Sequence, residues 1–354
     1  MAGEGYLDVR SFGAVGDGQQ DDTAAVQKAI DAAAEVQGTV LVPPGTYACS
    51  TLKLGPRTGL VGHPTWTYRA FGGAILQLAD EKARCLLDLT GAVGATLNGL
   101  CLDGARKGEG VHGVMIDKPD YGKEEDVPRI ERCRIAGFTG DGIHLGRIWC
   151  FTIRHSMVAF NGGCGVRVRG WDGFLLDNWL SGNRGAGYGA YEENASVTMT
   201  GNRVEWNGGG GIVIHNGGHY NICNNYIDRS IGTGIAVLPT PGWWGRAFAI
   251  TGNLIYRSGK PDLRPLGERE SAHAHFVGLR GLTFTGNTMD AGRDDGDKGE
   301  WSPRFGIVYG SLRDAVIQGN VLHSGALEQL MVDLGGHGEN VIVRDNPGSI
   351  FRPT

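Results

Sequence analysis

The feature that most constrains this chain is a glycine followed by an apolar residue, which recurs at nearly constant spacing. The glycines are Gly142, Gly165, Gly187, Gly211 and Gly234, so the steps are 23, 22, 24 and 23 residues. A fixed period of this length indicates a solenoid, in which each repeat forms one coil and buries its apolar side chains by stacking on the next. The residues after the glycines are mostly β-branched, which favours strands. The repeat therefore predicts an all-β, single-stranded parallel β-helix.

A ladder of asparagines runs between these strands, each following a short β-forming run. The members are Asn178, Asn202, Asn225, Asn253, Asn287, Asn320 and Asn346. Asparagine at the same bend of successive coils can hydrogen-bond the backbone of its neighbours and tolerates left-handed geometry. Glycine makes up 61 of the 354 residues, which fits a chain that turns several sharp corners in each coil. We expect the asparagines to be structural.

The N-terminal segment has the pattern of a helix followed by a strand. Val26, Ala29, Ile30 and Ala33 have helical spacing, and Asp21 or Asp22 is placed to cap the start of the helix. The strand "GTVLV" follows and is closed by a Pro-Gly turn.

The segments "FGAVGDGQQDDTAAVQKAIDAA" and "GTVLVPPGTY" resemble the entry module of the pectate-lyase-like superfamily, which includes proteins related to rhamnogalacturonase and alginate C5-epimerases. The resemblance implies a right-handed parallel β-helix whose first coil is covered by an amphipathic helix. We therefore expect residues 1–60 to form an N-terminal cap that continues into a β-helix over residues 61–354, as one domain. The motif indicates the fold rather than the reaction, because lyases, hydrolases, epimerases and phage tailspikes share it.

Charge and composition exclude several classes of protein. The formal net charge of −5 argues against a nucleic-acid partner, and no run of about 18 apolar residues could span a membrane. The N-terminus has no basic region followed by an apolar run, so we expect a cytoplasmic protein, or a secreted one if a leader has been removed. The seven cysteines lack CxxC spacing and are expected to be buried free thiols.

Strand alternation predicts which side chains face outward. With Ile143, Leu145 and their equivalents inside, their neighbours point to solvent, and equivalent positions of adjacent coils lie about 4.8 Å apart. The outward side chains are His144, Arg167, Arg169, Tyr191, Val213, His215 and Ala236, and the count extended past the strand ends adds Trp171 and Glu193. Stacking would place like charges side by side, a cost that an anionic ligand relieves. We expect one outward patch with His144, Arg167, Arg169, Tyr191, Glu193 and His215 as catalytic residues.

Insertions interrupt the regular coils and are expected to form ligand-holding loops. They span Pro239–Arg246, Arg257–His275 and Asp290–Arg304, with a fourth, highly charged stretch at Lys118–Val127. The substrate-binding residues expected beside the patch are Trp171, Asp172, Trp243, Trp244, Arg246 and His275. Aromatic faces stack on sugar rings, and a guanidinium can hold a carboxylate.

Neither a metal nor another cofactor is expected. Residues 294–300 have a calcium-like composition, but Lys298 and the short span depart from the twelve-residue loop pattern. His273 and His275 fit a pair of surface imidazoles better than a metal site.

The coils from residue 131 to 191 are similar in layout to those that carry the active site in alginate epimerases. The family has a Tyr-Gly-Phe-Asp-Pro-His type motif where this chain has residues 140–146. The similarity puts His144 where the family has its catalytic aspartate, Gly146 where it has the histidine, and Arg169 in place of a second aspartate. The location of the site is therefore shared, while its residue types differ.

Two mechanisms remain open for a carbohydrate substrate. In β-elimination on an acidic polysaccharide, Arg167 or Arg169 neutralises a uronate carboxylate, and His144, His215 or Tyr191 transfers protons. This reaction is favoured. The alternative is a glycoside hydrolase or transglycosylase with paired carboxylates, for which Asp172 and Glu193 on neighbouring coils are candidates. A third interpretation is a non-catalytic, tailspike-like glycan-binding protein, and the chain is compatible with a homotrimer or another homo-oligomer.

Overall fold

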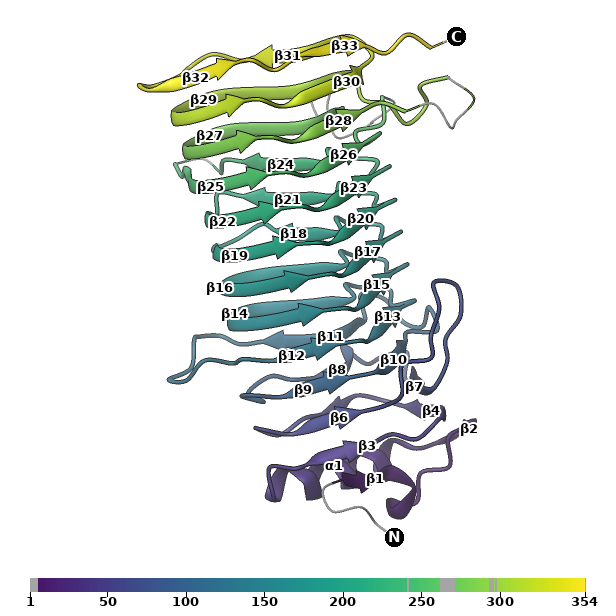
Figure 1. Cartoon of the computed structure of the whole chain (residues 1–354). Coiled ribbons are helices and arrows are strands. Elements are labelled where there is room, and N and C mark those ends of the chain that lie inside the picture. The colour runs from purple at the N-terminus through teal and green to yellow at the C-terminus, as the bar shows by residue number, and fades with distance from the viewer. Residues whose placement is uncertain (1–5, 241, 262–270, 293–295, 297, 354) are drawn as a thin grey trace. The chain divides into compact units, whose positions relative to one another are not determined.

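The computed structural model describes residues 6–240, 242–261, 271–292, 296 and 298–353. The chain divides into two compact units, residues 1–174 and 175–354. In each unit the chain runs in coils, and successive coils contribute short strands to three ladders of parallel strands (Figure 1). The predicted parallel β-helix is thus confirmed, while its organisation as one domain stays a prediction.

The first unit contains the irregular early coils. One ladder consists of β5 (Leu52–Lys53), β8 (Cys85–Asp88), β11 (His112–Asp117) and the start of β14 (Ile143–Arg154). A second consists of β1 (Tyr6–Asp8), β3 (Thr39–Leu41), β6 (Gly59–Val61), β9 (Thr96–Asn98), β12 (Arg129–Glu131) and the end of β14. The third consists of β2 (Asp17–Asp21), β4 (Gly45–Cys49), β7 (Ala74–Leu78), β10 (Leu100–Asp103), β13 (Arg134–Ala136) and β15 (Met157–Ala159). The strand β16 (Val166–Leu176) begins in this unit.

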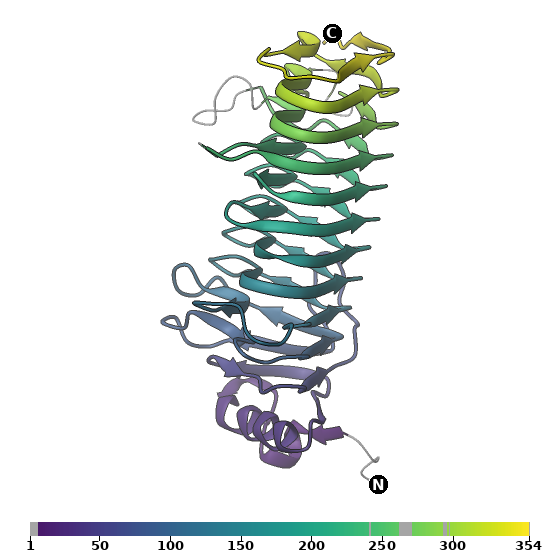
Figure 2. The same ribbon diagram turned by 90° about the vertical axis from the view of Figure 1, so that its left-hand side faces the viewer.

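The helix α1 (Thr23–Glu35) follows a short 3₁₀ turn, η1 (Val9–Phe12), and packs against β3 and β5 of the first coils (Figure 2). Its apolar stripe is fully buried at Val26, Ala29, Ile30 and Ala33. These are the positions that the helical spacing selected, so the predicted cap is confirmed.

The start of α1 differs in detail from the prediction. The Asp21 carboxylate accepts a hydrogen bond from the Thr23 amide at 2.9 Å. Asp22 occupies the N-cap position without a capping hydrogen bond, because its fully buried carboxylate accepts the amides of Val15 and Gly16 at 2.7 and 3.0 Å. Asp22 therefore fastens the preceding loop rather than the helix end.

The second unit contains the regular coils. One ladder consists of β18 (Tyr188–Ala190), β21 (Ile212–His215), β24 (Ile235–Leu238), the starts of β27 (Ala272–Thr285) and β29 (Phe305–Gln318), and β31 (Gln329–Asp333). A second consists of β19 (Asn194–Thr200), β22 (Gly218–Cys223), β25 (Gly245–Thr251), the ends of β27 and β29, and β32 (Val341–Arg344). The third consists of β17 (Trp179–Ser181), β20 (Arg203–Glu205), β23 (Tyr226–Asp228), β26 (Leu254–Tyr256), β28 (Thr288–Asp290), β30 (Val321–Ala326) and β33 (Gly348–Ile350).

The asparagine ladder lies in this second unit, where all seven predicted members are linked. Each backbone N–H donates to the side-chain oxygen of the next asparagine at 2.9–3.1 Å, from Asn178 through to Asn346. The predicted structural role is confirmed. A shorter ladder that the sequence analysis did not identify joins the buried Asn183 and Asn207 in the same way.

The interior follows the predicted alternation. The residue after each of the five glycines is buried in its strand, as Ile143 and Ile235 illustrate with no exposed surface. Two outward positions are also buried, because Val213 and Ala236 are only 8% and 3% exposed. Val213 and Ala236 are short side chains that pair in register with each other on adjacent coils. On the next coils, Val213 pairs with Gly189 and Ala236 with the larger His275. The expectation that both face solvent was wrong.

All seven cysteines are free thiols, as expected; five are buried, whereas Cys150 and Cys223 are only half-buried. Within the described part of the chain, no helix combines the length and the apolar content needed to cross a membrane.

Candidate active site

An aspartate–histidine pair lies at the start of β14 in the first unit. Asp141 Oδ2 is 2.8 Å from His144 Nδ1, and Asp141 Oδ1 accepts the backbone N–H of Cys164 at 2.7 Å. The Asp141 side chain is 8% exposed and His144 is 24% exposed. A carboxylate that holds Nδ1–H of an imidazole leaves Nε2 as the basic atom, which is the arrangement of a general base.

A second imidazole, from β11, lies against this pair. The rings of His112 and His144 have centroids 4.4 Å apart, and the Asp141 backbone N–H donates to His112 Nδ1 at 2.9 Å. Burial, followed by the neighbouring His144, lowers the pKa of His112 to about 4. His112 is therefore neutral at physiological pH, with its proton on Nε2, where it can donate a hydrogen bond.

The local backbone explains why these groups meet. Met115 of β11 pairs with His144 of β14, so His112 lies one coil away from the turn that carries Asp141. Gly163 leaves the space for the carboxylate, because a Cβ at that position would lie 2.3 Å from Asp141 Oδ1.

Charged side chains surround the pair. Asp117, at the end of β11, accepts a 2.7 Å ion-paired hydrogen bond from Arg84, which is the main reason that the pKa of Asp117 is lowered. Both Arg84 and Arg167 act on His112, since their positive charges contribute to its lowered pKa. Hydrogen bonds from His144 and from the Cys164 amide lower the pKa of Asp141 against the opposing effect of its burial. Asp141 is thus ionised where it can stabilise a protonated His144.

The same three side chains are of the types that hold a metal. Ligand atoms of His112, Asp141 and His144 lie within 4.8 Å of one another. His112 Nδ1, however, already accepts the Asp141 amide, so a metal bound through that atom would displace a hydrogen bond of 2.9 Å. The arrangement is thus better matched to proton transfer than to a resident metal.

Two other predicted residues of the first unit, Trp171 and Asp172, have aromatic neighbours. Trp171 stacks on Tyr121 with ring centroids 4.3 Å apart. Asp172 accepts a hydrogen bond from the Trp149 indole at 3.1 Å. The Lys118–Val127 insertion is fastened by Lys118 and Asp126, which form a nearly buried pair at 2.7 Å. Arg167 and Arg169 are half-buried.

In the second unit, Tyr191 and His215 lie edge to face with ring centroids 5.2 Å apart. Burial lowers the pKa of His215. Glu193 is exposed. The predicted patch draws members from both units, so its unity as one surface stays a prediction.

The tryptophan loop lines a pocket in the second unit. Trp243 is 70% exposed and Trp244 41%, and Arg280 lies 4.9 Å from the centre of the Trp244 ring. A pocket of about 350 Å³ is bounded by both tryptophans together with Pro239 and Val277. Arg246 is exposed at the start of β25. The loop therefore presents aromatic surface, as predicted, and its role with substrate stays a prediction.

The two histidines of β27 are not surface imidazoles. His273 is fully buried and His275 is 8% exposed. Burial lowers the pKa of His273 to about 3. The expectation failed because it treated the whole Arg257–His275 insertion as a loop, whereas β27 begins at Ala272 inside the stack. Of the calcium-like stretch, Asp294, Asp295 and Asp297 lie outside the described residues.

Sequence reasoning missed His112 and Asp141. Gly113 precedes Gly142 by 29 residues and is also followed by an apolar residue, so it marks an earlier coil with irregular spacing. Extending the repeat backwards by that coil would have placed His112 beside the turn of Asp141.

Comparisons with known proteins agree with this architecture. Residues 6–72 match the family described as rhamnogalacturonase A/epimerase, pectate lyase-like, and residues 99–253 match a right handed beta helix region. Both matches agree with the right-handed parallel β-helix and with the pectate-lyase-like resemblance of the N-terminal motif.

Particular relatives and structures extend the comparison. The mannuronan C5-epimerase AlgE5 of Azotobacter vinelandii is 32% identical over 239 residues, which cover 62% of this chain. That match spans only 23% of the epimerase. The A-module of mannuronan C-5 epimerase AlgE6 from the same organism has a TM-score of 0.73 at 19% identity, covering 97% of this chain and 99% of the module. A DFA-IIIase from Arthrobacter chlorophenolicus A6 in complex with DFA-III has a TM-score of 0.63 at 14% identity, covering 95% and 86% of the two chains, a likeness of fold alone.

Proposed function

We propose that this protein is an enzyme that acts on an acidic polysaccharide by removing the C5 proton of a uronate residue, with β-elimination as the outcome. The observation that carries this proposal is the Asp141–His144 pair at 2.8 Å beside the start of β14, with the neutral His112 ring 4.4 Å from that of His144. Relatives named as mannuronan C5-epimerases support an acidic polysaccharide as the substrate class.

His144 acts as the base through Nε2. It takes the C5 proton, and the ionised Asp141 stabilises the imidazolium that forms. The electron pair left at C5 forms the C4–C5 double bond as the C4–O4 bond breaks. The imidazolium then returns its proton to the leaving O4 oxygen. One imidazole can perform both transfers where the proton and the leaving oxygen lie on the same face of the sugar ring.

Cations make the C5 proton acidic enough to remove. In this proposal Arg167, whose charge acts on His112, neutralises the uronate carboxylate, with Arg169 as the further guanidinium of the same strand. The Nε2–H of His112 adds a hydrogen bond to the charge that develops on the substrate.

Residues of the second unit extend this proposal. Tyr191 and His215 are the candidates for a second proton-transfer pair, and Glu193 for a polar contact with the sugar. Trp243, Trp244 and Arg246 would hold further sugar rings at the pocket beside their loop.

Epimerisation is the second candidate, and identities of 30–33% to mannuronan C5-epimerases favour it. Both reactions begin by abstracting the C5 proton. They differ in the next step, because epimerisation returns a proton to the opposite face of C5 instead of breaking the C4–O4 bond. A donor on that opposite face is then required, whereas elimination needs only the His144 imidazole.

The test is a panel of uronate polymers in heavy water. Elimination gives an unsaturated product that absorbs in the ultraviolet, while epimerisation places deuterium at C5 without a double bond. His144→Ala should abolish either product, and His323→Ala, an exposed histidine of β30, should leave the rate unchanged. New reducing ends without unsaturation would instead indicate a hydrolase, and full activity of His144→Ala would refute the proposed base.

A further inference from the structure

A guanidinium on the third ladder of the second unit is held rigidly between two aromatic rings. Arg203 of β20 pairs in register with Trp179 of β17 on one side and Tyr226 of β23 on the other. Its guanidinium carbon lies 5.5 Å from the centre of the Trp179 ring and 4.6 Å from that of Tyr226. Cation–π contacts on both faces fix the plane of the guanidinium.

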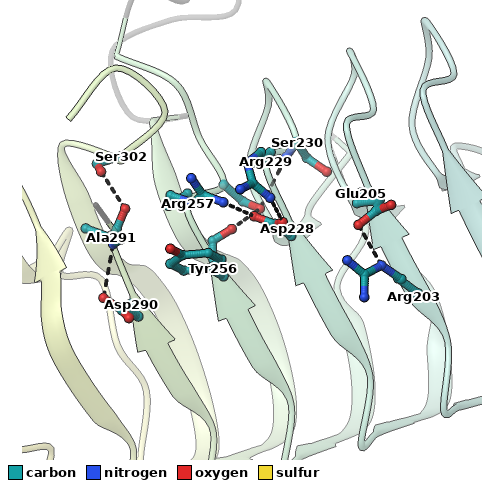
Figure 3. Close-up of polar contacts among 12 residues, drawn as sticks. Arg203, Glu205, Asp228, Arg229, Ser230, Tyr256, Arg257, Asp290, Ala291 and Ser302 are labelled. Atoms are coloured by element: carbon teal, nitrogen blue, oxygen red, sulfur yellow. Dashed lines mark hydrogen bonds and ion pairs between the residues drawn. The ribbon is translucent and has the colours of Figure 1, made fainter. Parts of the chain in front are cut away.

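A buried carboxylate fixes its remaining freedom. Glu205, whose side chain is 4% exposed, accepts the Arg203 Nε–H at 2.7 Å (Figure 3). It also accepts the Trp179 indole N–H at 2.7 Å. The Arg203 side chain is nevertheless 49% exposed. Among the described residues, neither of its terminal amino groups makes a hydrogen bond. The end of the guanidinium therefore presents two parallel N–H donors to solvent in a fixed geometry.

This geometry matches a carboxylate. Arginine binds carboxylates through two parallel hydrogen bonds, and a guanidinium fixed beforehand loses less freedom when it does so. The anchoring Glu205 lies beneath the surface, so the exposed edge presents donors rather than acceptors. We name the set Trp179, Arg203, Glu205 and Tyr226 the guanidinium clip.

The next coil carries another arginine, Arg229, which follows Asp228, the register partner of Glu205, and is therefore not in line with Arg203. The Arg229 guanidinium carbon lies 4.7 Å from the centre of the Trp206 ring and 5.8 Å from that of Tyr256. Arg229 also pairs with the fully buried Asp228 (Figure 3). Trp206 is 42% exposed, and Trp301 packs edge to face against it with ring centroids 5.4 Å apart.

We propose that the guanidinium clip is a non-catalytic binding site for a carboxylate of an acidic polysaccharide that lies across the third ladder of the second unit. The choice of a uronate polymer as the occupant rests on the proposed function. The site lies on the ladder that contains β20 and β23. It is not on the ladder that contains β21 and β24. The site would hold one part of the polysaccharide while other sugar residues of the same polysaccharide react.

The experiment measures retention of the protein in native gels that contain a polyuronate, a neutral glucan or a sulfated glycan. Arg203→Gln removes the donors, and Arg203→Lys keeps the charge but not the paired donors. The matched control is Arg154→Gln, because Arg154 is 45% exposed and ion-paired with Glu131 at 2.9 Å. Thermal unfolding of each variant verifies that it is folded.

We expect both Arg203 variants to weaken polyuronate binding at least about tenfold, as the loss of one bidentate charged contact predicts. Arg154→Gln should change the binding less than about twofold. Unchanged retention of folded Arg203→Gln, or an equal loss in Arg154→Gln, would overturn the site. Binding of the sulfated glycan alone would overturn the choice of occupant. Failure of the proposed function is seen separately, as the absence of product from every uronate.

Discussion

Replacing Asp141 by asparagine tests the central pair with almost no change of shape. Asp141 Oδ1 accepts the Cys164 amide at 2.7 Å while Oδ2 contacts His144 Nδ1 at 2.8 Å. An asparagine must keep its oxygen toward the Cys164 N–H, so its NH₂ group faces His144. The imidazole then has to accept at Nδ1 and carry its proton on Nε2, which leaves it unable to act as the base.

The size of the effect follows from two contributions. Turning the asparagine over to restore the correct tautomer sets a donor against the buried Cys164 N–H, at a cost of about 1–3 kcal/mol. Loss of the carboxylate also removes the electrostatic stabilisation of the imidazolium. Two unit charges 4 Å apart attract each other by about 4 kcal/mol at an effective dielectric constant of 20. Screening at a partly exposed site reduces this attraction to roughly half. Together they amount to about 4 kcal/mol, or roughly a thousandfold in kcat.

Two measurements check this reasoning. Steady-state rates on the polymer that the wild-type protein consumes should fall about a thousandfold in Asp141→Asn with little change in KM. The control is Asp117→Asn, a carboxylate near the same imidazoles that hydrogen-bonds Arg84 at 2.7 Å, for which we expect a loss of less than about threefold. Nitrogen NMR should show the proton of His144 on Nδ1 in the wild type and on Nε2 in the variant. Retention of more than about a tenth of the activity, or an unchanged tautomer, refutes the assigned role.

Three further predictions concern pH and stability. The His112 imidazole binds a proton near pH 6.5 in the unfolded chain but only near pH 4 in the folded protein. The free energy of unfolding, measured by urea titration, should therefore fall as the pH drops between these values. It should fall less steeply in His112→Gln. Burial raises the pKa of Asp228 from 3.8 to about 7, so stability should fall as the pH rises through that window, and Asp228→Asn should remove this fall in the same titrations. Asn253→Ala removes the acceptor of the buried Asn225 backbone N–H and side-chain NH₂ group, and should lower the free energy of urea-induced unfolding by about 3–5 kcal/mol. Asn346→Ala, at the half-exposed end of the ladder, should lower it by only about 1 kcal/mol. Equal losses would contradict the ladder argument.

The regular coils could be predicted because one physical rule repeats in them. Side chains alternate across a strand, so Ile212 and Ile235 identify the interior without further information. Every bend that carries Asn202 or Asn225 has the same hydrogen-bonding need, so their spacing alone predicted the ladder. The helix α1 followed from its own apolar spacing for the same reason.

The contacts that break this regularity could not be predicted. The Lys118–Val127 insertion lengthens the coil between Gly113 and Gly142, so the sequence period disappears just where His112 joins Asp141. Burial of His273 depends on where β27 begins within a long insertion, which no local pattern marks. Side-chain partnerships of this kind depend on three-dimensional proximity, and spacing in the sequence measures that only while the coils keep a constant length.

The asparagine ladder also bears on how proteins of this architecture change length. Each rung of the second unit joins one coil to the next through the same pair of hydrogen bonds, so the rungs are interchangeable. A duplication or loss of a complete turn of the chain would leave every remaining rung intact, whereas an insertion of one residue inside a strand would exchange its inner and outer faces. Evolution can therefore lengthen or shorten such a scaffold in whole turns, while single-residue changes are confined to its corners.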